Sequence, residues 1–87
     1  MHSLSQYDTH LQNALARETC RRAFAVRLDM TLKRSKVRSS RIARSLGVNE
    51  DVVAMWRAGV TVPRGSQCRQ LAELLKVEAD WLCVVRP

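Results

Sequence analysis

The sequence predicts an all-α protein: a compact domain of five helices with an extra helical segment at its N-terminus. Gly and Pro are absent from the first 46 residues, so no helix breaker interrupts that part of the chain. Apolar residues recur at intervals of three and four, the period of one helix face, and no long stretch alternates as a strand would. Because 87 residues have room for one core, we expect a helical extension at 1–22 and a domain at 23–87.

Two apolar stripes precede residue 35. The first comprises Tyr7, Leu11, Ala14 and Leu15, and the second comprises Ala23, Phe24, Leu28, Thr31 and Leu32. They are compatible with two helices that meet near residues 18–22 or with one long helix, and the sequence alone does not distinguish these alternatives. The polar segment 35–40 that follows predicts a connection.

Glycine and proline delimit the helices in the middle of the chain. A short helix is predicted up to Gly47, because Gly readily takes the left-handed conformation in which helices end. Asn49 is a good N-cap for the next helix, residues 50–58, which ends at Gly59. Pro63 prevents continuation, and two more helices are predicted, one from near Ser66 and one after residue 77. Their apolar positions are Leu71, Ala72, Leu74, Leu75, Ala79, Trp81 and Leu82.

Charge provides the first indication of function. The net charge is +7, and residues 17–44 carry ten basic and two acidic side chains, which accounts for the whole excess. Such a basic segment favours a phosphate-rich partner, although a basic face that serves solubility is the alternative. Only 5% of the residues are aromatic, too few to stack many unpaired bases, so duplex nucleic acid is the expected partner.

Several function classes are not expected. The chain has no GxSxG, no Gly-rich phosphate loop and no HExxH, so we assign no catalytic residues and no cofactor. Cys20, Cys68 and Cys83 are odd in number and widely spaced, which argues against a disulfide framework and for small buried apolar residues. No zinc-ligand spacing occurs, so no metal is expected. Without an export signal or a membrane span, the expected location is the cytoplasm.

The central feature is a pair of short helices joined by a tight turn at residues 46–49. Its internal packing would come from Ile42, Ala43, Leu46, Val48, Val53 and Trp56. A small residue at Ala43 lets the second helix cross close to the first, and Gly47 reverses the chain. A helix-turn-helix needs this arrangement to present its second helix to a major groove.

From residue 24 to residue 82 the chain resembles the lambda-repressor-like or XRE class, which includes phage repressors and Cro proteins. The matching positions are Phe24, Leu28, Val37, Ile42, Ala43, Leu46, Gly47, Val48, Val53, Trp56, Gly59, Pro63, Leu71, Ala72, Asp80, Trp81 and Leu82. The resemblance implies a five-helix fold, sequence-specific binding of duplex DNA and, in most members, a homodimer. One departure is Lys76, which stands where a Gly usually ends the fourth helix.

The resemblance also implies roles for single residues. Base contacts are expected from Glu50, Asp51, Ala54 and Met55, and phosphate contacts from Lys36, Arg38, Ser39, Arg41, Arg57 and Arg64, with Arg44 equally compatible with a solvent-exposed charge. The acidic pair allows two interpretations. A carboxylate can accept a hydrogen bond from cytosine N4, or it can simply compensate the dipole at the helix N-terminus.

We therefore expect a DNA-binding transcriptional regulator of the repressor or Cro type that recognises a double-stranded operator as a homodimer. Candidate dimer surfaces are the C-terminal residues Trp81, Val84 and Val85 and the N-terminal stripe Leu4, Tyr7, Leu11 and Leu15. The alternative is a protein-interaction module, an antitoxin or anti-repressor whose partner is a protein such as a toxin. A membrane partner is not expected, because the basic residues alternate with apolar ones that the core requires.

Overall fold

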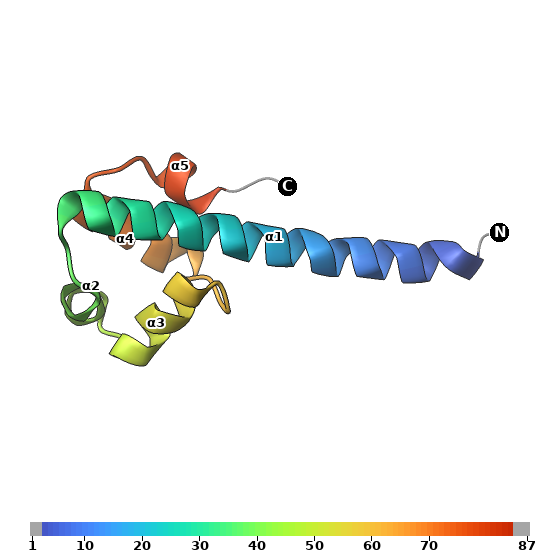
Figure 1. Cartoon of the computed structure of the whole chain (residues 1–87), viewed down its shortest axis with the longest axis horizontal. Helices are drawn as coiled ribbons and strands as arrows, with labels where there is room; N and C mark the ends of the chain where they lie inside the picture. Colours follow the sequence, from blue (N-terminus) through green and yellow to red (C-terminus); the bar gives the residue numbers. More distant parts are fainter. Residues whose placement is uncertain (1–2, 85–87) are drawn as a thin grey trace.

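The N-terminal extension and the first helix of the domain form one continuous helix, α1 (Ser3–Ser35). The computed structural model describes the backbone of residues 3–84 and the side chains of residues 17–84. In Figure 1 the N-terminal half of α1 projects beyond the other helices, which pack along its C-terminal half. Of the two alternatives for this segment, the single helix is correct, and the absence of Gly and Pro from it is the physical reason.

Four shorter helices follow α1. They are α2 (Ser39–Leu46), α3 (Glu50–Ala58), α4 (Gly65–Leu75) and α5 (Ala79–Cys83). Residues 3–84 contain no strand, so the predicted all-α class is confirmed. Both α3 and α5 pack on α1, and they do not contact each other. Figure 1 shows α2 and α3 on one side of α1 and α5 on the other.

Every helix contributes to one hydrophobic core. The buried apolar residues of this core are Phe24, Leu28, Leu32, Ile42, Ala43, Val53, Trp56, Cys68, Leu71, Ala72, Leu75 and Leu82. Burying one large apolar side chain contributes about 1.5–3 kcal/mol to folding. The core positions predicted for α2 and α3 are confirmed, with Leu46 and Val48 partly buried at the edge of the core.

Four residues end or follow helices in the left-handed conformation. Two are Gly47 (φ 68°) and Gly59 (φ 77°), which end α2 and α3 as predicted. The other two are Lys36 (φ 59°) and Lys76 (φ 58°), which follow α1 and α4. A side chain with a Cβ loses roughly 1–2 kcal/mol in this conformation, so both lysines occupy positions that glycine would relieve.

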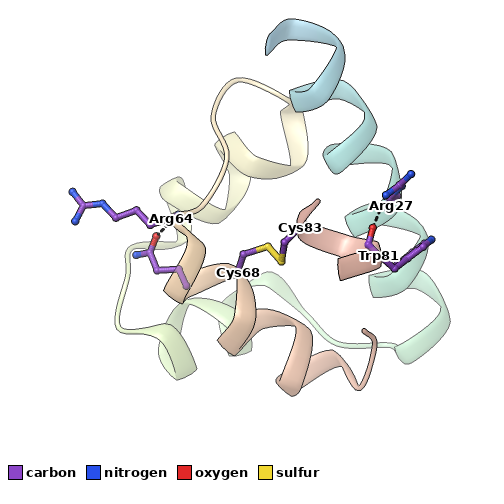
Figure 2. The surroundings of a disulfide bond; sticks show 6 residues. Arg27, Arg64, Cys68, Trp81 and Cys83 are labelled. Atoms are coloured by element: carbon purple, nitrogen blue, oxygen red, sulfur yellow. Dashed lines mark hydrogen bonds between the residues drawn. A yellow bond between two sulfur atoms is a disulfide. The ribbon is translucent and has the colours of Figure 1, made fainter. Parts of the chain in front are cut away.

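A disulfide joins Cys68 of α4 to Cys83 at the end of α5, as Figure 2 shows. The expectation that the cysteines are separate apolar residues was therefore wrong for this pair. The packing of α5 on α4 is the reason, because it brings the two Cα atoms to 6.0 Å, within the usual range for a disulfide. Cys20 lies on α1 and is half-buried.

None of the helices within residues 3–84 is long and apolar enough to cross a bilayer.

The conformation of Lys76 leads to a stability prediction. Replacing Lys76 with Gly should raise the free energy of unfolding by about 0.5–1 kcal/mol, because Gly adopts the left-handed conformation without a Cβ penalty. The matched control is Arg69→Gly in the interior of α4, where the same residue type should lower stability by about 1 kcal/mol. Urea denaturation followed by far-UV circular dichroism measures both changes. A destabilised Lys76→Gly variant would contradict this account of the α4 terminus.

Candidate nucleic-acid interface

The helices α2 and α3 pack against each other across a three-residue connection, residues 47–49. The Val48 N–H donates to the Ala43 carbonyl at 2.9 Å, which closes the turn after Gly47. Because Ile42 and Val53 are both completely buried, the two helices share the core beneath this connection. Helix α3 is consequently anchored to the core through its apolar side.

Helix α3 has one buried and one exposed side. Val53 and Trp56 point into the core, while the four residues expected to contact bases are all exposed: Glu50, Asp51, Ala54 and Met55. The two carboxylates stand in the first turn, where they favour the helix dipole whether or not they also meet a ligand. The outward face of α3 is thus acidic at its start and small or apolar further along.

Basic side chains lie before and along α2. Lys36 follows α1, Arg38 occupies the N-cap position of α2, and Arg41 and Arg44 lie on that helix. All four residues are exposed, and none forms an ion pair with another residue among those the structure describes. An unpaired exposed cation keeps its full charge available for a phosphate.

Arg57 behaves differently from these cations, because it has partners within the chain. Its guanidinium donates one hydrogen bond to the Ser39 hydroxyl at 3.0 Å and another to Asp29 Oδ1 at 2.9 Å. Lys33 also contacts Asp29, at 2.9 Å from Nζ to Oδ2. This cluster ties α3 to α1 and to the start of α2, so the charge of Arg57 is partly neutralised. Ser39 accepts in this contact, which leaves its own O–H able to donate.

The same cluster changes the acidity of Asp29. Hydrogen bonds from Lys33 and from Arg57 lower the pKa of this carboxyl below its ordinary value, more than its partial loss of hydration raises it. The carboxylate therefore stays ionised at neutral pH and keeps both cations in place.

Arg64, the remaining residue expected to contact phosphate, stands at the N-cap of α4. Its backbone N–H donates to the Gln67 side-chain oxygen at 3.0 Å. The guanidinium extends away from the helix, as Figure 2 shows, and is exposed. The backbone of Arg64 thus caps α4, while its guanidinium stays exposed to solvent.

Of the candidate dimer residues, the structure describes the side chains of two. Trp81 is 41% exposed and Val84 is 49% exposed. Arg27 of α1 stacks over the Trp81 ring, 5.6 Å from its centroid, and donates to the Trp81 carbonyl (Figure 2). Leu4, Tyr7, Leu11, Leu15 and Val85 lie outside the described side chains.

Sequence reasoning missed two apolar residues on the same side of the molecule. Val26 and Met30 are 59% and 50% exposed, one turn apart on α1. Met30 and Trp81 both border a hollow of about 530 Å³ between α1, the end of α4 and α5. The spacing of four between Val26 and Met30, opposite the buried Phe24 and Leu28, could have revealed this face.

Within the described residues, no three His, Cys, Asp or Glu side chains come close enough to hold a metal ion. No family model, curated protein or solved structure matches the chain. The geometry of α2 and α3 and the charge around them are therefore the basis for assigning a function.

The Asp29 cluster predicts a specific pH dependence. Because the folded-state pKa of Asp29 is lowered, the cluster contributes stability above the ordinary pKa of an aspartate and loses it as the pH falls through the lowered pKa. Asp29→Asn should be less stable than the parent at pH 7 and lose less stability between pH 6 and pH 3. Urea unfolding at several pH values measures both, with the exposed Glu73→Gln on α4 as the control. Parallel pH profiles for Asp29→Asn and the parent would show that the cluster does not hold α3.

Proposed function

We propose that this protein is a sequence-specific, double-stranded DNA-binding transcriptional regulator in which α2 and α3 act as a helix-turn-helix. The observation that carries the proposal is the combination of an exposed α3 face with unpaired basic side chains beside it on α2. A DNA-binding helix pair needs both features, because basic side chains position the protein on the phosphates while the exposed helix face contacts bases and selects the sequence. The resemblance to lambda-repressor-like proteins supports the same assignment.

The exposed face of α3 suits the major groove in size and chemistry. A helix of nine residues is about 14 Å long, enough for its outward side chains to meet four or five base pairs. Glu50 and Asp51 would accept hydrogen bonds from cytosine N4, and Ala54 and Met55 would contact thymine methyl groups. This combination favours a half-site with pyrimidines facing α3.

The phosphate contacts would come mainly from the unpaired cations, which are Lys36, Arg38, Arg41 and Arg64. Ser39 would donate its hydroxyl to a phosphate oxygen while it accepts from Arg57. Arg57 would act chiefly by holding α3 against α1 and α2, since Asp29 already neutralises part of its charge. The unpaired basic side chains would thus bind the DNA phosphates, and Arg57, which is paired with Asp29, would position α3.

A homodimer follows from the amount of sequence that one copy of α3 can read. A half-site of four or five base pairs is too little information for a unique site in a genome, so pairing across two half-sites is expected. Met30 of α1 and Trp81 of α5 are exposed and border the same hollow, and the exposed residues Val26, one turn before Met30, and Val84, directly after α5, would extend this apolar face. Pairing through this face would leave both α3 helices free.

The second candidate function is a protein-interaction module, an antitoxin or anti-repressor. Two observations favour it: the acidic start of α3, and the hollow between α1 and α5 that an apolar side chain of a protein partner would fill. A module of this kind would bind its partner with little dependence on DNA.

Arginine substitutions on α2 separate these two functions. Arg38→Ala and Arg41→Ala should each weaken binding to every duplex and reduce the salt slope of log K by about one unit, because each removes one phosphate contact. Arg34→Ala removes the same charge next to the hollow on the α5 side and should change the slope less. Fluorescence anisotropy with selected and scrambled duplexes at two salt concentrations gives the slopes. If both α2 variants bind as tightly as the parent, the protein-interaction module becomes the better assignment.

Glu50 tests how α3 reads bases. If Glu50 accepts from cytosine, Glu50→Ala should raise non-specific binding and reduce the preference for the selected duplex by about 1–3 kcal/mol. If it only compensates the helix dipole, the substitution should leave the preference unchanged and lower folding stability by about 0.3–1 kcal/mol. Competition binding and urea denaturation of the same variant distinguish the two roles. Unchanged preference would remove Glu50 from the base contacts.

Sedimentation equilibrium tests the dimer. At tens of micromolar the mass should be twice the 9.9 kDa of one chain, and Trp81→Glu should weaken association at least tenfold, because a carboxylate would be buried in an apolar contact. Val60→Glu, which changes another exposed apolar residue on the loop after α3, should leave the mass unchanged. A mass of one chain, with and without DNA, would overturn the dimer proposal.

A further inference from the structure

All three cysteines line one cavity. Its volume is about 240 Å³, and its walls are formed by Cys20, Phe24, Val62, Pro63, Gly65, Cys68 and Cys83. These residues come from α1, the loop before α4, α4 itself and the end of α5, so only the folded chain brings the three sulfur atoms to one place. Among the residues that the structure describes, the other walls are apolar or glycine, and none of them is charged.

The two cysteines of the disulfide are unequally buried. Cys68 is 3% exposed, whereas Cys83, at the end of α5, is half-buried. A thiolate that enters the cavity therefore meets Cys83 more readily than Cys68. Exchange at a disulfide depends on such access, because the attacking sulfur must approach along the S–S axis.

Besides the disulfide, α5 is held by its packing on α4 and α1. The helix has five residues, far too few to be stable alone. Its buried anchor is Leu82, and Arg27 adds one hydrogen bond and ring stacking at Trp81. The covalent link to Cys68 therefore adds a constraint to the packing that keeps this short helix in place (Figure 2).

We propose that this cavity is a thiol–disulfide exchange site, at which small cellular thiols such as tripeptide thiols open and close the Cys68–Cys83 bond and thereby release or fasten α5. In the first step the thiolate of the small molecule bonds to Cys83 Sγ, the Cys68–Cys83 bond breaks, and Cys68 leaves as a thiolate that takes up a proton. In the second step another small thiol attacks the mixed disulfide, which yields the Cys83 thiol and the oxidised small molecule. In total, two molecules of the small thiol supply two electrons and two protons to the protein. The oxidised small molecule re-forms the Cys68–Cys83 bond by the reverse of both steps.

The expected compartment agrees with this chemistry. In the cytoplasm, thiols are kept reduced and protein disulfides are usually transient or redox-sensing. A disulfide between buried Cys68 and half-buried Cys83 of the five-residue α5 suits that use better than a permanent structural role, because every described buried core residue except Leu82 lies on α1 to α4.

A consequence for assembly rests on the proposed function. Trp81 and Val84 belong to the face through which we propose that two copies pair, and both lie on or directly after α5. Opening the disulfide would loosen this face without touching α2 or α3, so it would weaken pairing and leave the DNA-reading surface of each chain unchanged.

The exchange is tested on the whole protein without DNA. The wild type is equilibrated in buffers of graded reduced-to-oxidised glutathione ratio, quenched with acid, alkylated and analysed by mass spectrometry. We expect reversible opening of the Cys68–Cys83 bond within that range, with glutathione attached to Cys83 at intermediate ratios. Cys20→Ser is the matched control, because Cys68 and Cys83 are then the only cysteines left in the sequence. Its disulfide should open at the same ratio of reduced to oxidised glutathione as that of the wild type. Opening that requires denaturant would overturn the exchange site.

Hydrogen exchange measures the release of α5. The amides of Leu82 and Val84, which bond to Glu78 and Asp80, should exchange at least tenfold faster in the reduced protein and in Cys83→Ser. The Val52 amide in α3 should be unaffected and serves as the internal reference. Equal α5 exchange in both states would overturn the proposed release. Sedimentation of the same samples tests the assembly consequence separately: a single-chain mass in both states would contradict the proposed pairing and not the exchange site.

Discussion

The burial of Val53 and Trp56 is the constraint on which the rest of the structure depends. Both side chains are at most 2% exposed, and both project from the same side of α3 into the core formed with α1 and α2. With this side in the core, the residues on the other side of α3, which include Glu50, Ala54 and Met55, face solvent. Glycines at both neighbouring helix ends, Gly47 and Gly59, let the chain turn sharply enough for α3 to lie there. The outward face is thus a consequence of core packing.

Polar contacts also hold α3 against α1 and α2. Asp29 of α1 accepts from Arg57 of α3, and the same guanidinium reaches Ser39 at the start of α2, so three helices meet at one polar cluster. Around this cluster the exposed cations of α2 have no partners among the described residues. On the opposite side of α1 lies the hollow that Trp81 and Met30 border together with the charged residues Arg34, Lys76 and Glu78. Helix α1 therefore separates the surface of α2 and α3 from the hollow beside α5.

Helix ends and core positions could be predicted from the sequence, because they depend on residues close together in the chain. Helix ends at Gly47 and Gly59 could be predicted because only glycine takes the left-handed conformation without penalty, and the core of α2 and α3 followed from helical spacing. What failed depended on contacts between distant segments. Cys68 and Cys83 meet only because α5 packs on α4, and Arg57 finds Asp29 only because α3 packs on α1. No local pattern records either pairing.

Amide chemical-shift mapping with a short duplex of mixed sequence tests whether α3 reads DNA, because it reports which side of α1 meets the ligand. We expect shifts for residues 36–41 and 50–58, around the start of α2 and along α3, while amides of α5 stay within error. Shifts confined to α5 and the adjoining part of α1, or no shifts at a duplex concentration where α3 should be saturated, would contradict a DNA-reading role for α3.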